Sequence, residues 1–203
     1  FLVMVTRKGL IKKTAIEDFA NVRRSGLIAL KLKTDDFLEW VKPSTGTSEI
    51  MIATKLGQAI RFREKDVREM GRTAAGVRGM RLKSDDEVIG MEVVDPKNKS
   101  LEFLTIGSNG LGKRTQLDEY KVQGRGGSGI KTTEITKKTG PLISARVVDK
   151  VDADEKDLII MSAKGQVIRL PFKSVNTSGR ATQGVRLMRF KEEGDHVVNV
   201  TML

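Results

Sequence analysis

The sequence predicts an all-β, propeller-like array of four-stranded blades, and three observations support this fold class. The 203 residues contain four copies of one layout, repeated about every 50 residues. Within each copy, short runs of alternating apolar and polar residues are separated by glycine or aspartate turns. Windows with helical periodicity are almost absent. Such a pattern is typical of bladed arrays, in which each repeat packs against its neighbours.

Each copy is expected to contain four strands. An apolar run comes first, a turn glycine follows it, and a second run carries basic residues. The turn glycines lie 48, 53 and 55 residues apart. A second glycine then introduces the third strand ("GLIALKL", "GVRGMRL", "GIKTTEI", "GVRLMRF"), and a polar turn precedes the fourth. The turn glycines are Gly9, Gly57, Gly110 and Gly165, and the second glycines are Gly26, Gly76, Gly129 and Gly184.

These repeats predict one domain, or a fragment of one, that covers residues 1–203. We place the repeats at 1–48, 49–100, 101–157 and 158–203. The chain lacks an initiator Met and opens within an apolar run, so we expect it to be a piece of a longer polypeptide. The window 14–25, "TAIEDFANVRRS", imitates a helix start, but its equivalents in the other copies contain glycine. We therefore expect a loop with at most one helical turn.

The composition favours a polyanionic partner. Lys and Arg number 37 against 26 Asp and Glu, which gives a formal net charge of +11. The absence of cysteine and the single histidine, His196, exclude disulfides, thiolate chemistry and a classical zinc site. No apolar stretch approaches the roughly 20 residues of a membrane-spanning helix, so we expect a cytoplasmic protein.

The basic residues recur at fixed places in the repeats. One set lies four residues after each turn glycine, and another lies two residues after the second glycine, where the first repeat has Ile28. Equivalent residues of successive blades would form a basic band that binds a polyanion, while acids gather in the turns. Charged strand faces that merely prevent edge association would not explain this separation of signs. The predicted contacts are Lys13, Arg61, Arg114 and Arg169 in the first set and Arg78, Lys131 and Arg186 in the second.

Glycine-rich loops carry a third set of basic residues. The stretch 123–129, "QGRGGSG", aligns with "MGRTAAG" and "SGRATQG", so that Arg72, Arg125 and Arg180 each lie four residues before the second glycine. Glycine lets the backbone approach DNA closely, and arginine suits a phosphate. The first repeat lacks this arginine and offers Arg23 and Arg24 nearby. Because only nine residues are aromatic, duplex DNA is a better partner than a single strand, whose bases need stacking platforms.

No motif argues for catalysis or for a bound cofactor. The stretch 107–114, "GSNGLGKR", nearly matches a phosphate-binding loop, but Arg114 replaces the Ser or Thr that would hold magnesium. No helix is expected after it to supply backbone donors. His196 has no partner for a catalytic set, and Asp85 and Asp86 are turn residues.

Several long, ordered segments resemble the C-terminal domain of DNA gyrase A, which is closely related to the corresponding domain of topoisomerase IV. They include "GLIALKL", "IRFREKDVREMGRTAAGVRGMRL", "GLGKRTQLDEYKVQGRGGSGIKT" and "GRATQGVRLMRF". The resemblance implies a β-pinwheel, a disc of blades with a strand exchanged between neighbours, whose basic outer edge wraps duplex DNA and supports negative supercoiling. It also implies a noncatalytic domain whose partners are duplex DNA, the rest of gyrase A, and gyrase B. ATP and magnesium would act elsewhere in the holoenzyme, and Tyr120 would not be the nucleophile.

The resemblance further implies a seven-residue box, Q-[RK]-R-G-G-[RK]-G, that is needed for wrapping. Gln123, Arg125, Gly126, Gly127 and Gly129 match this box. Gly124 and Ser128 stand where the box is basic, so this copy is degenerate, and the principal box of a six-bladed disc would precede Phe1.

Three other functions stay open from the sequence. A topoisomerase IV type of domain would bend DNA without strong wrapping. A propeller scaffold would bind acidic proteins, although no exposed aromatic hot spot is evident. A nucleotide-using enzyme would depend on the imperfect loop at 107–114.

Overall fold

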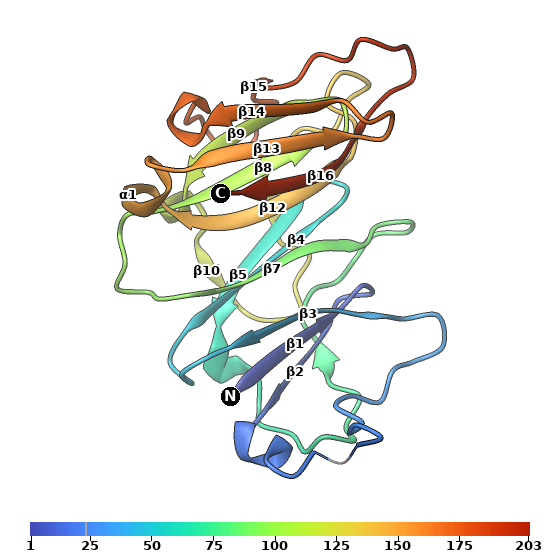
Figure 1. Ribbon diagram of the computed structural model, residues 1–203. Helices are drawn as coiled ribbons and strands as arrows, with labels where there is room; N and C mark the ends of the chain where they lie inside the picture. Colours follow the sequence, from blue (N-terminus) through green and yellow to red (C-terminus); the bar gives the residue numbers. More distant parts are fainter. Residues whose placement is uncertain (23) are drawn as a thin grey trace.

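The computed structural model describes residues 1–22 and 24–203, which form four β-sheets (Figure 1). The predicted all-β class is confirmed. In the window 14–25 the described residues contain one 3₁₀ turn, as expected, and one short α-helix that the sequence did not predict follows the last strand of the third repeat. The helical segments are η1 (Ile16–Phe19), η2 (Glu64–Asp66), η3 (Leu117–Glu119), η4 (Phe172–Ser174) and α1 (Lys150–Ala153).

Each repeat contributes three long antiparallel strands to its own blade. The first and second strands form a hairpin at the turn glycine, and the fourth pairs with the other side of the first. These strands are β1 (Leu2–Thr6), β2 (Leu10–Thr14) and β3 (Leu38–Pro43); β4 (Glu49–Thr54), β5 (Gln58–Arg63) and β7 (Val88–Val94); β8 (Leu101–Gly107), β9 (Leu111–Gln116) and β12 (Leu142–Asp149); and β13 (Asp157–Ser162), β14 (Val167–Pro171) and β16 (Val197–Met202).

The third strand of a repeat is short and lies in the preceding blade. β6 (Val77–Arg78) pairs with β2, β11 (Ile130–Lys131) with β5, and β15 (Val185–Arg186) with β9. A parallel strand, β10 (Val122–Gln123), also joins β5. The strand exchange of a pinwheel is therefore confirmed. The four sheets have four, five, four and three strands, so the prediction of four strands in every blade holds only for the first and third.

The prediction of a third strand in the first repeat, at residues 26–32, is wrong. This segment is not a strand in the structure. The glycine that opens each exchanged strand has a positive φ, and a side chain there would meet the neighbouring strand: a Cβ on Gly129 would lie 2.4 Å from the Ala59 carbonyl oxygen. Gly26 has a similar φ of +77°, but no atom lies within 4 Å of its Cβ position. The same local sequence therefore forms a strand only where another blade offers an edge.

The blades pack face to face, so the middle blades are buried on both sides. In β4, Ile50 and Ile52 pack against the first blade, whereas Met51 packs against the third. In the last blade, by contrast, β13 alternates between buried and half-buried residues, because only one of its faces meets another blade. The continuous apolar character of β4 thus reflects two interfaces, as in other strands covered on both faces.

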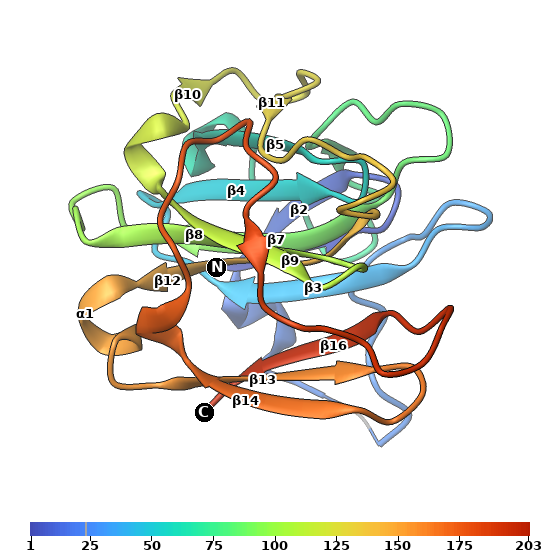
Figure 2. The same ribbon diagram turned by 90° about the horizontal axis from the view of Figure 1, so that it is seen from above.

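The order of strands fixes which part of each blade faces outward. The fourth strands β3, β7, β12 and β16 contact one another in sequence and surround the centre of the array. The exchanged strands lie at the opposite edge of each sheet. Figure 2 shows β10 and β11 at the periphery of the molecule, with β3, β7 and β16 nearer the middle. Among the described residues, no helix has the length and apolar character needed to cross a bilayer.

Candidate nucleic-acid interface

The exchanged strands place three exposed cations along the outer edge. Arg78, Lys131 and Arg186 are exposed, and each pairs with the first residue of the second strand in the preceding blade. They therefore occupy equivalent positions on three successive blades, as the repeat predicted. We call these three residues the rim cations. At the corresponding place in the first repeat, Ile28 is 68% exposed.

The loop arginines reach back to the preceding repeat. Each donates a hydrogen bond to the backbone carbonyl of the residue two positions after the second glycine: Arg72 to Ile28 at 3.3 Å, Arg180 to Lys131 at 2.7 Å, and Arg125 to Arg78. All three side chains remain partly exposed. The structure thus brings each loop arginine beside the segment after the second glycine of the preceding repeat, and Arg125 and Arg180 lie next to rim cations.

The glycine-rich stretch 123–129 is attached by its backbone. Gln123 pairs with Phe62 in the parallel strand, and the Gly126 N–H donates to the Gly79 carbonyl at 2.8 Å. The Gly127 carbonyl accepts a hydrogen bond of 2.8 Å from the Arg81 N–H. Gly124 and Ser128, which stand where the implied box is basic, are exposed. The two absent charges would therefore have faced solvent.

Two further predicted contacts come from the loop of the first repeat. Arg24 is exposed. Arg23 lies outside the described residues.

The predicted basic band on the second strands is wrong for three of its four members. Lys13, Arg61 and Arg114 are only 7–8% exposed. Arg61 Nε donates to Glu49 Oε2 at 2.7 Å, and its Nη1 donates to the carbonyls of Leu117 and Tyr120 at 3.0 and 3.3 Å. Because these groups are enclosed between blades and already paired, a phosphate on the surface cannot contact them.

The arginines of the second strands follow a pairing rule that the sequence analysis missed. Arg61 pairs with Glu49, Arg114 with Glu102 and Arg169 with Asp157, and each acid precedes its arginine by 12 residues. The two residues are diagonal neighbours across the first hairpin, within reach of long side chains. In the first repeat the corresponding residue is Phe1, whose ring centroid lies 4.9 Å from Lys13 Nζ. Arg169 makes the same pair, but its side chain is 70% exposed.

The imperfect phosphate-binding loop at 107–114 is enclosed as well. Lys113 is only 1% exposed, and its Nζ donates a hydrogen bond of 2.6 Å to the Gly179 carbonyl. Its ammonium group is therefore engaged with the protein rather than open to a nucleotide.

Tyr120 and His196 lie in different environments. Tyr120 is buried, its hydroxyl interacts with Thr132, and burial raises its pKa to about 12. His196 is exposed. The described part of the chain contains no group of three or more His, Cys, Asp or Glu residues that could hold a metal ion.

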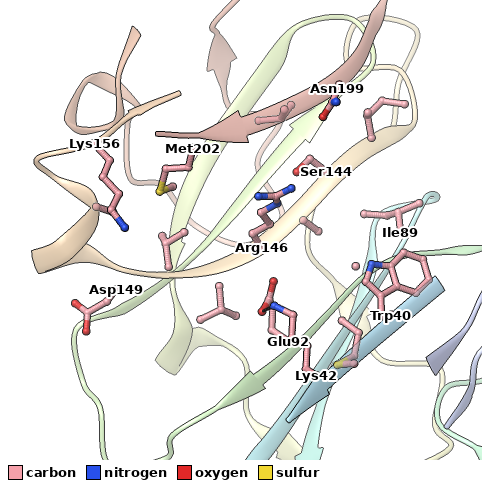
Figure 3. A pocket seen from close by; sticks show the side chains of 18 of the residues that line it. Trp40, Lys42, Ile89, Glu92, Ser144, Arg146, Asp149, Lys156, Asn199 and Met202 are labelled. Atoms are coloured by element: carbon pink, nitrogen blue, oxygen red, sulfur yellow. Dashed lines mark hydrogen bonds and ion pairs between the residues drawn. The ribbon is translucent and has the colours of Figure 1, made fainter. Parts of the chain in front are cut away.

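The centre of the array contains a hollow of about 620 Å³, lined mainly by the fourth strands (Figure 3). Lys42 and Glu92 form an ion pair there, and burial raises the pKa of Glu92. Figure 3 shows Arg146 on the neighbouring fourth strand, β12, which also lines the hollow. The lining has three cationic and three acidic residues: Lys42, Arg146, Lys156, Glu92, Asp149 and Asp152. This balance gives a polyanion less attraction here than at the rim cations.

Comparison with known proteins gives a consistent result. A family model described as the DNA gyrase C-terminal domain, beta-propeller, matches residues 1–45, 48–95, 101–149 and 156–202. The chain is 40% identical over 189 residues to DNA gyrase A of Staphylococcus epidermidis and 39% identical over 193 residues to that of Staphylococcus aureus. These matches cover 93% and 95% of the chain but 21% of each relative. The chain thus spans about a fifth of the length of these relatives.

Two solved structures resemble it closely in fold. One is the C-terminal domain of DNA topoisomerase IV, with a TM-score of 0.89 and 25% identity, which covers 100% of this chain and 61% of that one. The other is the DNA gyrase A C-terminal domain, with a TM-score of 0.82 and 25% identity, which covers 99% of this chain and 64% of that one.

Proposed function

Because the chain belongs to the family of DNA gyrase C-terminal domains, we propose that it binds duplex DNA along its outer edge and wraps it. One observation carries this proposal: Arg78, Lys131 and Arg186 recur at one position on successive blades, exposed at the rim. A curved row of cations attracts the phosphates of one DNA segment and bends it along the row. The partly exposed loop arginines beside the rim cations add donors suited to phosphate oxygens.

The proposed binding depends on DNA shape rather than on base sequence. Phosphate contacts fix the position of a protein on the duplex but do not read the bases. Bending stiff DNA costs energy that depends on its sequence, so flexible sites would be favoured. Two basic positions of the implied box are Gly124 and Ser128 here. We therefore assign the loop at 123–129 a supporting role.

In the intact enzyme the domain would act without chemistry of its own. We propose that it presents wrapped DNA to the rest of gyrase A and to gyrase B in the cytoplasm, and so supports negative supercoiling. The domain itself would need no cofactor, while ATP and magnesium would be used elsewhere in the holoenzyme.

A topoisomerase IV type of function is the second candidate. The TM-score of 0.89 to the C-terminal domain of DNA topoisomerase IV favours it, whereas the 40% identity to a DNA gyrase A favours wrapping. Ligation of nicked plasmid in the presence of the protein distinguishes the two. Wrapping leaves a net change in linking number after the protein is removed, whereas bending alone leaves none.

Replacement of the rim cations tests the proposal. The triple variant Arg78→Gln, Lys131→Gln and Arg186→Gln should bind duplex DNA more weakly, and the slope of log affinity against log salt should fall by about three. The matched control replaces three exposed lysines outside the exchanged strands, Lys97, Lys99 and Lys150, with Gln. This control changes the net charge equally but should largely preserve the salt slope. Equal effects of both triples would refute a localised interface.

A further inference from the structure

We propose that two buried lysines, Lys12 and Lys113, act as positioning residues that hold the glycine-arginine loop of the following repeat, and thereby set how its arginine meets DNA. The inference rests on the proposed function, because it assumes that the loop arginines contact phosphate. It adds interior residues to a binding surface that is otherwise defined by exposed cations.

Both lysines donate hydrogen bonds to the glycine-arginine loop of the next repeat, and Lys12 also donates to a carbonyl of its own repeat. Lys113 Nζ donates to the carbonyls of Gly179 and Arg180 and, at 3.2 Å, to Thr182 Oγ1. Lys12 Nζ donates to the Ala29 carbonyl at 2.7 Å and to the Arg72 carbonyl. Each lysine therefore binds the main-chain carbonyl of a loop arginine. The guanidinium of that same arginine, Arg180 or Arg72, extends to the segment that follows the second glycine of the preceding repeat.

Burying an ammonium group at this position carries a large desolvation penalty. Lys12 and Lys113 are 0% and 1% exposed, and removing a charge from water is costly unless hydrogen bonds compensate. The equivalent residues in the second and fourth repeats are Ile60 and Ile168. The fold therefore accommodates an apolar side chain at this position. What lysine adds is a set of donors, all three of which Lys113 uses to fix one loop.

The second blade shows what happens without the lysine. Ile60 is fully buried, and a side chain on Gly127 of the following loop would lie 3.6 Å from it. That loop, residues 123–129, is instead attached by backbone hydrogen bonds to Gly79 and Arg81. The array thus presents two lysine-anchored loops and one loop that is held without a lysine.

The charged groups around each lysine should make its protonation depend on bound DNA. Glu119 and Arg180 face Lys113, and Glu119 also accepts a hydrogen bond of 2.9 Å from the Arg180 N–H. Asp18 and Arg72 face Lys12. Burial lowers the pKa of both lysines, that of Lys113 to about 8. A phosphate at Arg180 would favour the protonated form, so DNA binding should take up a proton above about pH 8.

Lys113→Met is the direct test, with Ile60→Met as the matched control because both place Met at the same position of adjacent second strands. Lys113→Met should weaken binding to duplex DNA by roughly fivefold, comparable to the loss of part of one phosphate contact. Ile60→Met should leave affinity within about twofold, as expected for a volume-conserving core change. Unmodified protein should bind progressively more weakly from pH 8 to pH 10, whereas Lys113→Met should lose most of this dependence.

A double-mutant cycle with Arg180→Ala distinguishes positioning from a general structural effect. If Lys113 acts through the loop arginine, Lys113→Met should have almost no effect in an Arg180→Ala background, whereas an independent effect would add. Should Lys113→Met not fold, Lys12→Met with Arg72→Ala and the pH profile of unmodified protein test the same claim. Failure of unmodified protein to bind duplex DNA would overturn the proposed function. Normal binding by Lys113→Met with an unchanged pH profile would overturn only the proposed role of Lys113 as a positioning residue.

Discussion

The cations of the second strands and the rim cations recur with the same regularity but lie in opposite environments. Arg61 and Arg114 are buried between blades and paired with acids, whereas Arg78, Lys131 and Arg186 are exposed at the outer edge. Regular recurrence in a repeat protein therefore shows only that a position is structurally equivalent in each copy. Whether the cation stabilises the array or faces a ligand depends on whether neighbouring blades enclose it, because Arg169 has an acid partner and is still 70% exposed.

The largest predicted effect comes from breaking a buried pair. Arg61→Met should reduce the free energy of unfolding by about 3–5 kcal/mol, because Glu49 would stay buried without its partner. Urea denaturation measures this loss, and Arg78→Met provides the exposed control with an expected change within about 0.5 kcal/mol. Replacing Glu49 and Arg61 together with apolar residues should recover most of the loss. A cost for Arg61→Met as small as that of Arg78→Met would contradict the distinction between the two sets.

The next effect concerns the glycines that position the rim cations. Gly129→Ala should cost about 2–3 kcal/mol, because φ is +71° and the new Cβ would lie 2.4 Å from the Ala59 carbonyl oxygen. Gly26→Ala, at a φ of +77° with open space around it, should cost only about 1 kcal/mol. Thermal and urea unfolding of both variants measure the difference. Equal costs would mean that the exchanged strand adds little to the stability of the array.

The sequence predicted the strands better than their partners. Period-2 alternation and turn glycines are local signals, so β4, β5 and β7 could be read from the chain. The strand at Val77–Arg78 and the segment 26–32 share one local pattern, yet only the former pairs with another blade. Such pairing depends on hydrogen bonds between residues that are distant in the sequence, and local sequence patterns do not report these bonds.

The candidate site was also predicted in part. The equivalence and exposure of Arg78, Lys131 and Arg186 follow from their place after the second glycine. The burial of Arg61 and Arg114 did not follow from their own positions, because a cation on a strand is usually exposed. The acid 12 residues earlier was an available signal for their pairing, but Arg169 shares it and is exposed, so it does not predict burial. For Lys12 and Lys113 no comparable signal exists, since most of their partners are backbone carbonyls distant in the sequence.

A smaller effect would appear in the pH dependence of stability. Burial lowers the pKa of Lys113 from its ordinary value of 10.5 to about 8. Between these pH values the unfolded chain binds more protons than the folded protein, so stability should rise with pH. Unmodified protein should gain on the order of 1–2 kcal/mol over Lys113→Met from pH 8 to 10.5. Urea titrations across this range measure the gain, and a parallel response of the two proteins would contradict it. The exposed arginines of the rim remain charged throughout and supply no such dependence.

The smallest effect tests whether burial, rather than the pairing itself, separates the two sets of cations. Arg169 repeats the geometry of Arg61, with Nε 2.6 Å from Asp157 Oδ2, but its side chain is 70% exposed on the last blade. Solvent and salt screen such a pair, so Arg169→Met should cost less than about 1 kcal/mol. Urea denaturation at low salt and in 1 M NaCl measures the loss of stability and how far salt reduces it. At 1 M salt, charges are screened beyond about 3 Å. The cost should decrease further in high salt for Arg169→Met and change little for Arg61→Met. Equal losses of stability for the two substitutions would show that the hairpin geometry alone provides the stabilisation. Enclosure between blades would then not explain why the second-strand cations stabilise the array.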